Sequence, residues 1–188
     1  MVYRSSAYSG NFIVMRAFDI RLVLFDVDGV LTDGSIYIGH DGEVLKSFNA
    51  KDGVAVALLQ KHDVKVGVIS GKASKALDFR INQLNFDYAI TNCNNKLVGL
   101  KDIMKCESFN ASQIAFVGDD IIDIPVMKEV GLAIAPSDAH ELVIKCANYV
   151  TSAKGGYGVA RESAEFILKT AGLSLTEMYS GLVDDITQ

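Results

Sequence analysis

The sequence predicts an α/β protein built on a Rossmann-like, doubly wound parallel sheet, with a small β-hairpin inserted after the first strand. Three observations support this prediction. Short, nearly continuous apolar runs recur along the chain, and stretches with helical periodicity separate them, which is typical of parallel strands covered on both faces. The chain has 188 residues, which fits one domain with a sizeable core. It is 49% hydrophobic and contains only two prolines, as expected of a compact globular protein.

Six apolar runs are the candidate strands, and six stretches between or after them are the candidate helices. The strands are expected at Leu22–Asp26, Val64–Ser70, Tyr88–Thr91, Ile114–Gly118, Leu132–Ala135 and Tyr149–Val150. The helices are expected at Gly53–His62, Ser74–Leu84, Lys96–Cys106, Ile124–Val130, His140–Cys146 and Val159–Ala171. Parallel sheets of this kind bind ligands beyond the carboxyl ends of their strands, so the residues that follow each strand are the first candidates for a site.

Residues 35–48 depart from this alternation of strands and helices, because apolar and polar residues alternate there on both sides of His40-Asp41-Gly42. An Asp-Gly pair between alternating segments predicts a β-hairpin. The segment is too short to form a domain of its own, and an isolated two-stranded hairpin is marginally stable in water. We therefore expect it to pair with copies from other subunits.

The chain divides into three parts. We expect residues 1–20 to be an N-terminal extension, residues 21–172 to form the domain and residues 173–188 to be a C-terminal tail. Leu173, Leu175, Met178 and Leu182 form a helical stripe in this tail, which favours packing against the domain.

Composition excludes several classes of partner. The net charge of −5 and the pI near 5.1 do not fit a nucleic-acid-binding protein. Apolar runs are too short to span a membrane. The three cysteines are odd in number and far apart, which is typical of unpaired thiols in a reducing cytosol, so we expect a cytoplasmic protein.

Acidic residues follow two of the predicted strands. Asp26 and Asp28 end the first strand, and alternation places their carboxylates on the same side of an extended segment. Asp119, Asp120 and Asp123 follow the strand at 114–118. In a parallel sheet both clusters reach the same edge, and carboxylates so close together repel one another unless a cation or a shared proton offsets them. Oxygen ligands of this kind suit Mg²⁺.

Two further features lie at the same edge. Ser70 and Gly71 end a strand and could hold an anion through the hydroxyl and backbone N–H groups. Lys96 begins a helix and carries a charge suited to a phosphoryl group. Each feature alone has an ordinary structural explanation, since such acids cap helices and such lysines are solvated. Four of them on one edge favour a functional site.

With these motifs the sequence resembles the haloacid dehalogenase superfamily of phosphatases, from about Arg21 to about Ala171. Asp26-Val27-Asp28-Gly29 matches the first motif, Ser70 the second, Lys96 the third and the segment 118–123 the fourth. The resemblance implies that Asp26 is the nucleophile and Asp28 the general acid and base. It also implies Mg²⁺ held by Asp26, the Asp28 carbonyl and Asp119, with Asp120 and Asp123 behind it, and phosphate bound by Ser70, Gly71 and Lys96.

A closer resemblance is to the 3-deoxy-D-manno-octulosonate 8-phosphate (Kdo 8-phosphate) phosphatases of lipopolysaccharide synthesis. It rests on the hairpin in place of a cap domain, on FNAKDG at 48–53, on DIIDIPVM at 120–127 and on GGYGVARE at 155–162. This family is tetrameric through its hairpins, which implies a homotetramer here. The implied substrate contacts are Asp28, Asn49, Ala50, Lys51, Asp52, Gly53, Lys72, Arg80 and Lys96.

Departures from the family pattern leave a second substrate open. Lys72 stands where the family usually has an arginine, and Ala57 stands where an arginine is common. A lysine keeps the charge but not the two-pronged geometry of a guanidinium. A nonulosonate 9-phosphate of the sialic-acid type, or another small sugar phosphate, is therefore the alternative substrate.

Two hypotheses come from other classes of protein. A response-regulator receiver also combines Mg²⁺, aspartate and lysine on a parallel sheet, but its phosphorylated aspartate follows a middle strand. A non-catalytic oligomerisation module built on the hairpin would not need the four motifs. Steady release of phosphate from sugar phosphates distinguishes the enzyme from both.

Overall fold

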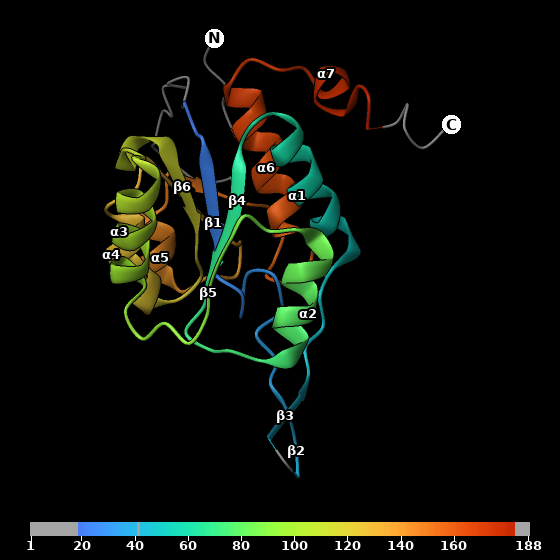
Figure 1. The fold of residues 1–188 in the computed structure, drawn as a ribbon, viewed down its shortest axis with the longest axis vertical. Helices are drawn as coiled ribbons and strands as arrows, with labels where there is room; N and C mark the ends of the chain where they lie inside the picture. The colour runs from blue at the N-terminus through green and yellow to red at the C-terminus, as the bar shows by residue number, and fades with distance from the viewer. Residues whose placement is uncertain (1–18, 41, 183–188) are drawn as a thin grey trace.

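The computed structural model describes residues 19–40 and 42–182, which form a six-stranded parallel sheet with helices on both faces (Figure 1). The strand order is β5-β4-β1-β6-β7-β8, which is the Rossmann order 3-2-1-4-5-6 once the hairpin is left out of the count. The predicted fold class is confirmed. The strands are β1 (Leu22–Phe25), β4 (Lys65–Ile69), β5 (Tyr88–Ile90), β6 (Ile114–Val117), β7 (Leu132–Ala135) and β8 (Tyr149–Val150).

The strand order reverses between β1 and β6, which are neighbours in the sheet. Phe25 at the end of β1 lies opposite Val68 of β4 on one side and Val117 of β6 on the other. The three strands therefore end at nearly the same level. The segments that follow them begin at Asp26, Ser70 and Gly118, and such a reversal is where sheets of this type bind ligands.

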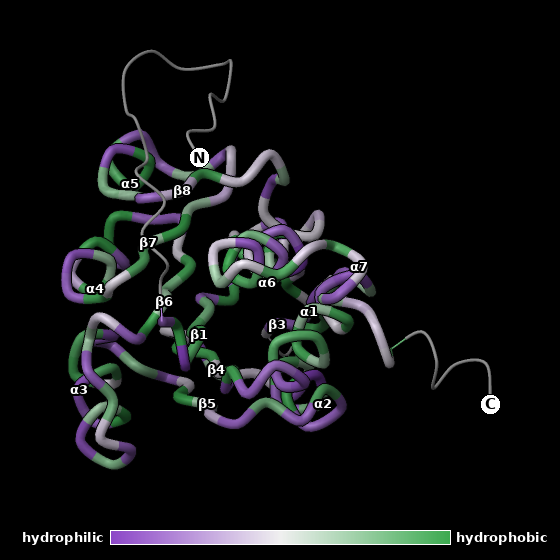
Figure 2. The backbone as a smooth tube through the Cα atoms, turned by 90° about the horizontal axis from the view of Figure 1, so that it is seen from above, coloured by the Kyte–Doolittle hydropathy of each residue, from purple (hydrophilic) through white to green (hydrophobic). Residues whose placement is uncertain are grey.

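Helices cover the two faces of the sheet separately (Figure 2). Val23 and Phe25 of β1 belong to a core shared with α1, α2 and α6, whereas Leu22 and Leu24 belong to a second core shared with α3, α4 and α5. These four side chains are fully buried, as expected for a central parallel strand. The helices are α1 (Ala50–Lys61), α2 (Lys75–Leu84), α3 (Lys96–Glu107), α4 (Ile124–Met127), α5 (Glu141–Cys146) and α6 (Val159–Thr170), with 3₁₀ turns η1 (Ala111–Gln113) and η2 (Ile121–Asp123).

Two predicted helix boundaries were wrong by three residues. Helix α1 begins at Ala50 and not at Gly53, because the Asn49 side chain accepts a hydrogen bond from the backbone N–H of Lys51 and caps the helix earlier. Helix α4 ends at Met127 and not at Val130. The early start of α1 places Asn49 in the segment that joins the hairpin to the helix.

The predicted hairpin is present and projects from the carboxyl edge of the sheet (Figure 1). Strands β2 (Tyr37–Gly39) and β3 (Gly42–Leu45) pair antiparallel as a separate two-stranded sheet. Asp41, in the predicted turn, lies outside the described residues. Ile38 and Val44 are 69% and 62% exposed, so the apolar side chains of the hairpin are not covered by the domain that carries them.

The described part of the tail packs against the domain at the opposite edge of the sheet. Helix α7 (Leu175–Tyr179) buries Met178 in the core that contains α1 and α6. The carbonyl of Met178 lies 3.0 Å from Nε2 of His62, at the C-terminal end of α1. Residues 1–18 of the predicted extension and 183–188 of the tail lie outside the described residues. None of the helices described has the length and hydropathy needed to cross a membrane.

Candidate active site

Asp26 lies directly beyond β1, at the centre of the carboxyl edge. Its backbone N–H donates to the carbonyl of Val117 at 2.9 Å, which continues the pairing between β1 and β6 by one residue. The residue is 6% exposed. The sheet therefore fixes the backbone of Asp26 and leaves its side chain to meet the loops around it.

Glycines bring the segment after Asp26 close to two other loops. Gly29 has a φ of +90°, and a Cβ at this position would overlap the carboxylate of Asp119. The N–H of Gly156 donates to the carbonyl of Val30 at 3.0 Å, and a Cβ on Gly155 would overlap the carbonyl of Gly29. The segment 155–158 thus packs against residues 26–34, called the nucleophile loop after the role that the sequence predicts for Asp26. This contact gives a physical reason for the two adjacent glycines of the segment.

Lys96 lies between two carboxylates from different strands. Its Nζ is 2.7 Å from Oδ1 of Asp26 and 2.6 Å from Oδ1 of Asp123. The other oxygen of Asp123 accepts hydrogen bonds from the backbone N–H groups of Asp119 at 3.0 Å and Asp120 at 3.3 Å. Lys96 and Asp123 are 4% and 0% exposed. Asp123 therefore orients both the lysine and the loop that carries Asp119.

Burial and mutual repulsion shift the pKa values of these groups. Burial raises the pKa of Asp26 to about 6, against the opposing charge of Lys96. Burial, together with the charges of Asp26 and Asp123, raises the pKa of Asp119 to about 8. Burial alone would lower the pKa of Lys96, but the charges of Asp26 and Asp123 outweigh it and raise that pKa. One lysine does not neutralise three carboxylates, so the site favours a further cation.

The carboxylate cluster has the chemistry of a divalent metal site. One oxygen from each of Asp26, Asp119 and Asp123 lies within 4.8 Å of the others. Oδ1 of Asp119 is buried and has no hydrogen-bond partner among the described residues. A buried, unpaired carboxylate oxygen is costly unless a ligand satisfies it. The oxygens fit Mg²⁺, which binds one or two carboxylates together with water and phosphate.

The structure separates Asp120 from Asp123, although we expected the two to act together behind the metal. Asp120 is exposed and caps η2, since its Oδ1 accepts a hydrogen bond from the N–H of Ile121 at 2.7 Å. Asp123 belongs to the carboxylate cluster itself. Of these two acids, only Asp123 touches the Lys96 ammonium group.

Ser70 and Gly71 lie beyond β4, next to Asp26. Ser70 is 2% exposed, and its hydroxyl accepts a hydrogen bond from the N–H of Lys72 at 3.3 Å. Its carbonyl accepts from the N–H of Cys93 at 3.0 Å, which ties this turn to the loop before α3. The structure thus places Ser70, Gly71 and Lys96 on segments next to Asp26.

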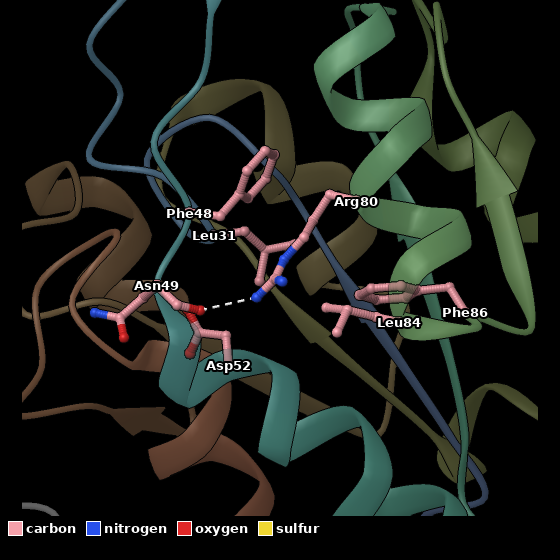
Figure 3. Close-up of a pocket in the computed structure, with 7 residues that line it drawn as sticks. All are labelled: Leu31, Phe48, Asn49, Asp52, Arg80, Leu84 and Phe86. Carbon is pink, nitrogen blue, oxygen red and sulfur yellow. Dashed lines mark hydrogen bonds between the residues drawn. The ribbon is translucent and has the colours of Figure 1, made fainter.

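Asn49, Asp52 and Arg80, three of the predicted substrate-binding residues, line a pocket whose side forms a wall beside the site (Figure 3). Arg80 on α2 points across a narrow pocket, and its Nη2 donates to the carbonyl of Asn49 at 3.0 Å. The guanidinium also lies 5.9 Å from the ring centre of Phe48. The Asn49 side chain donates to the carbonyl of Gly156 at 3.0 Å. These contacts join the hairpin base, α2 and the 155–158 segment into one wall.

The remaining predicted contacts divide into exposed and buried positions. Lys51 and Lys72 are exposed, and Ala50 begins α1. Gly53 packs closely against Leu84 and Arg80. Asp52 is 4% exposed, and its Oδ1 accepts a hydrogen bond from the N–H of Arg161 at 3.3 Å, near the start of α6. In this structure the Asp52 carboxylate therefore contacts a helix end.

Sequence analysis missed Lys46, which meets Asp28 at the mouth of the site. Its Nζ lies 2.5 Å from Oδ1 of Asp28, and the side chain of Lys46 is 1% exposed. The only signal in the sequence is a lysine near the end of an alternating segment, where a charged residue is ordinarily solvated. The structure reveals the contact because the hairpin returns over the nucleophile loop.

Comparisons with known proteins agree with this geometry. Residues 90–162 match the haloacid dehalogenase-like hydrolase family. A 3-deoxy-D-manno-octulosonate 8-phosphate phosphatase of Yersinia pestis is 42% identical over 156 residues, which cover 83% of each chain. A crystal structure of the phosphatase from the same species is similar, with a TM-score of 0.81 and 41% identity over 85% of this chain and 86% of that one.

One solved structure carries ligands. The Kdo 8-phosphate phosphatase of Moraxella catarrhalis was crystallised with a magnesium ion, a phosphate ion and a Kdo molecule. It has a TM-score of 0.80 and 31% identity, and the match covers 83% of this chain and 90% of that one.

Proposed function

Because the chain belongs to the 3-deoxy-D-manno-octulosonate 8-phosphate phosphatases, within the haloacid dehalogenase-like hydrolases, we propose that it hydrolyses Kdo 8-phosphate to Kdo and phosphate. It is a phosphomonoesterase with Mg²⁺ as its cofactor. The observation that carries the proposal is the cluster of Asp26, Asp119, Asp123 and Lys96 at the sheet edge. A receiver domain or a purely structural module would not need this arrangement together with the wall formed by Asn49 and Arg80.

In the proposed reaction Asp26 attacks phosphorus and forms an aspartyl-phosphate, while Asp28 protonates the departing sugar oxygen. Asp28 then removes a proton from the water that hydrolyses the intermediate. Lys96 and Ser70 bind phosphoryl oxygens and offset the charge that develops on them. The sheet holds Asp26 and the helix start holds Lys96, so both groups are positioned before substrate arrives.

Asp26, Asp119 and the Asp28 carbonyl would hold the metal, and Asp123 would orient the loop of Asp119. Mg²⁺ supplies positive charge to the transferring phosphoryl group. The unpaired Oδ1 of Asp119 supports this assignment, because a ligand oxygen in a metal site has no need of a protein donor. Asp120 would act on the waters around the metal, since its exposed carboxylate lies at the rim.

Substrate selection would come from Arg80 in this wall and from the exposed Lys51 and Lys72. A sugar-acid phosphate has two anionic ends, and separated cations suit such a ligand. Asn49, Ala50, Asp52 and Gly53 would shape the wall between them. Arg80 is already held by the carbonyl of Asn49, which supports a fixed orientation of its guanidinium.

The enzyme would act as a homotetramer in the cytoplasm. The exposed apolar side chains of β2 and β3 support assembly through the hairpin, since they are uncovered in the monomer. The absence of cysteine pairs among Cys93, Cys106 and Cys146 is compatible with a reducing compartment. We expect neither nucleic acid nor a membrane as a partner.

Phosphate release tests the proposed function. The wild-type protein is assayed with Kdo 8-phosphate, a nonulosonate 9-phosphate and glucose 6-phosphate, each with Mg²⁺ and with EDTA. We expect the highest kcat/KM for Kdo 8-phosphate and loss of turnover in EDTA. A higher kcat/KM for the nine-carbon substrate would replace the proposed substrate, and turnover that persists in EDTA would remove the metal from the reaction.

A further inference from the structure

The contact between the hairpin and the nucleophile loop is made by a buried lysine. Lys46 follows β3, and its Nζ donates to Oδ1 of Asp28 at 2.5 Å and lies 3.3 Å from Oε2 of Glu43. Its side chain is 1% exposed, whereas the side chain of Asp28 is 24% exposed. One oxygen of Asp28 is therefore held by the hairpin, and the side chain remains partly exposed.

This geometry restrains the residue to which the proposed function assigns proton transfer. A general acid must lie within hydrogen-bond reach of the oxygen that it protonates, so the orientation of its carboxyl group matters. The backbone of Asp28 is set by the nucleophile loop, but its side chain needs a partner to select one rotamer. Lys46 provides that partner from a segment 18 residues away in the sequence.

A role for Lys46 in binding the substrate directly fits the structure less well. Its ammonium group already meets two carboxylates, Asp28 and Glu43, and solvent reaches almost none of its side chain. Burial alone would lower the pKa of Lys46, but the hydrogen bonds and charges of Asp28 and Glu43 together outweigh it and raise that pKa. Lys72, by contrast, is exposed beside the site, so it is the better placed lysine for an anionic ligand.

Resting on the proposed function, we propose that Lys46 is a positioning residue that aligns Asp28 for proton transfer and couples this alignment to the hairpin. Placement of the hairpin thereby becomes part of the catalytic geometry. A displacement of about 1 Å in a catalytic group can cost about 100-fold in rate. Loss of the lysine should therefore slow proton transfer without weakening phosphate binding to the same degree.

The test compares two leaving groups in single-turnover reactions with the full chain and Mg²⁺. When the phosphoryl group of phenyl phosphate is transferred to Asp26, the P–O bond to the phenol oxygen breaks. Phenol is a poor leaving group, so this oxygen needs the proton of Asp28. The p-nitrophenolate anion leaves without a proton. We expect Lys46→Met to slow phenol release about 10- to 100-fold and p-nitrophenolate release less than about threefold. The KM measured at steady state should stay within about twofold of the wild-type value.

Lys46→Arg keeps the charge and is expected to restore most of the phenol release. Lys145→Met is the matched control, because it removes an exposed lysine from an ion pair with Glu141 and should leave both rates unchanged. If Lys46→Met does not fold, as judged by circular dichroism, Lys46→Leu replaces it under the same criteria, since it also removes the donor to Asp28.

Equal losses with both leaving groups, a rise in KM alone, or unchanged rates would each overturn the proposal. Kdo 8-phosphate hydrolysis by the wild-type protein is measured in parallel. Failure of that reaction would overturn the proposed substrate, while the comparison of leaving groups would still decide the role of Lys46.

Discussion

The carboxyl edge of the sheet and the hairpin above it each supply a buried lysine to the nucleophile loop, but the two lysines rest on different supports. Lys96 begins α3, whose Leu100 and Ile103 are buried in the core of the domain. Lys46 follows a two-stranded hairpin whose Ile38 is 69% exposed. Asp26 is thus held by the core of the domain, and Asp28 by a segment that the domain leaves uncovered.

This difference separates two requirements of phosphoryl transfer. Charge stabilisation needs groups that do not move during the reaction, which the interior of a parallel sheet provides. Proton transfer and substrate selection depend on residues that must also admit the sugar, and a projecting segment can leave room for it. If the hairpin is held by other subunits, assembly would affect the second requirement much more than the first.

The largest expected effect comes from the nucleophile itself. Asp26→Asn should retain the fold, because the side chain keeps its size and the backbone hydrogen bond to Val117 remains. Phosphate release should fall by about 10⁴-fold or more, as expected when a covalent nucleophile is removed. Asp102→Asn is the control, since Asp102 is exposed on α3 and should keep wild-type activity. Near-normal turnover of Asp26→Asn would contradict the mechanism.

Lys96→Met tests the lysine that begins α3. The change leaves Asp26 and Asp123 without the cation that lies within 2.7 Å of both. Turnover should fall about 10³-fold, and the free energy of unfolding in metal-free buffer should fall by about 3 kcal/mol, as for other broken buried pairs. Chemical denaturation and phosphate release measure the two effects. A stability equal to that of the wild type would show that the buried carboxylates do not need this lysine.

Much of this edge was predictable from sequence. Asp26, Ser70 and Asp119 follow apolar runs and Lys96 begins a helical pattern, so a parallel sheet brings them together whatever the details of packing. The prediction needed only the strand ends and the fold class, and the structure confirms that fold class.

The contacts between loops were not predictable in the same way. Lys46 meets Asp28 only because the hairpin returns over the nucleophile loop, and hydrophobic periodicity does not encode that path. The role of Gly155 depends on its approach to the carbonyl of Gly29, which joins segments far apart in the sequence. Asn49, in contrast, could have been recognised as a helix cap, because asparagine before a helical segment is a common start signal.

The hairpin can be tested without touching the core. The double variant carries Ile38→Glu and Val44→Glu. The wild-type side chains at these two positions are 69% and 62% exposed, respectively, in the monomer. We expect the subunit to keep its circular dichroism spectrum, to sediment as a monomer and to lose activity about tenfold, since Asp28 would lose part of its alignment. Analytical ultracentrifugation and phosphate release measure these effects.

Leu142→Glu is the matched control for the hairpin variant, because Leu142 is 51% exposed on α5, away from the hairpin. It should keep both the oligomer and the activity. An active monomer of the double variant would break the proposed coupling between assembly and Asp28, and a double variant that remains tetrameric would place the interface elsewhere.

The smallest expected effect is a dependence of stability on pH. It arises from carboxylates at the carboxyl edge of the sheet and not from the hairpin. The pKa values of Asp26 and Asp119 are raised to about 6 and about 8, so the folded protein without metal binds protons that the unfolded chain has already lost. Stability should therefore fall as pH rises from pH 5 to pH 8, because the folded protein loses these two protons over that range. Mg²⁺ can take the place of these protons, and saturating Mg²⁺ should remove or reverse the slope.

Denaturation midpoints at several pH values, with EDTA and with Mg²⁺, measure this dependence. Asp119→Asn should flatten the metal-free slope and remove most of the stabilisation by Mg²⁺, because it replaces the carboxyl group with the higher pKa. The hairpin variant should keep the wild-type slope, since neither carboxylate of this pair contacts Lys46. Metal-free stability that rises with pH would show that the carboxylates are ionised in the folded protein, and that Lys96 alone offsets their charge.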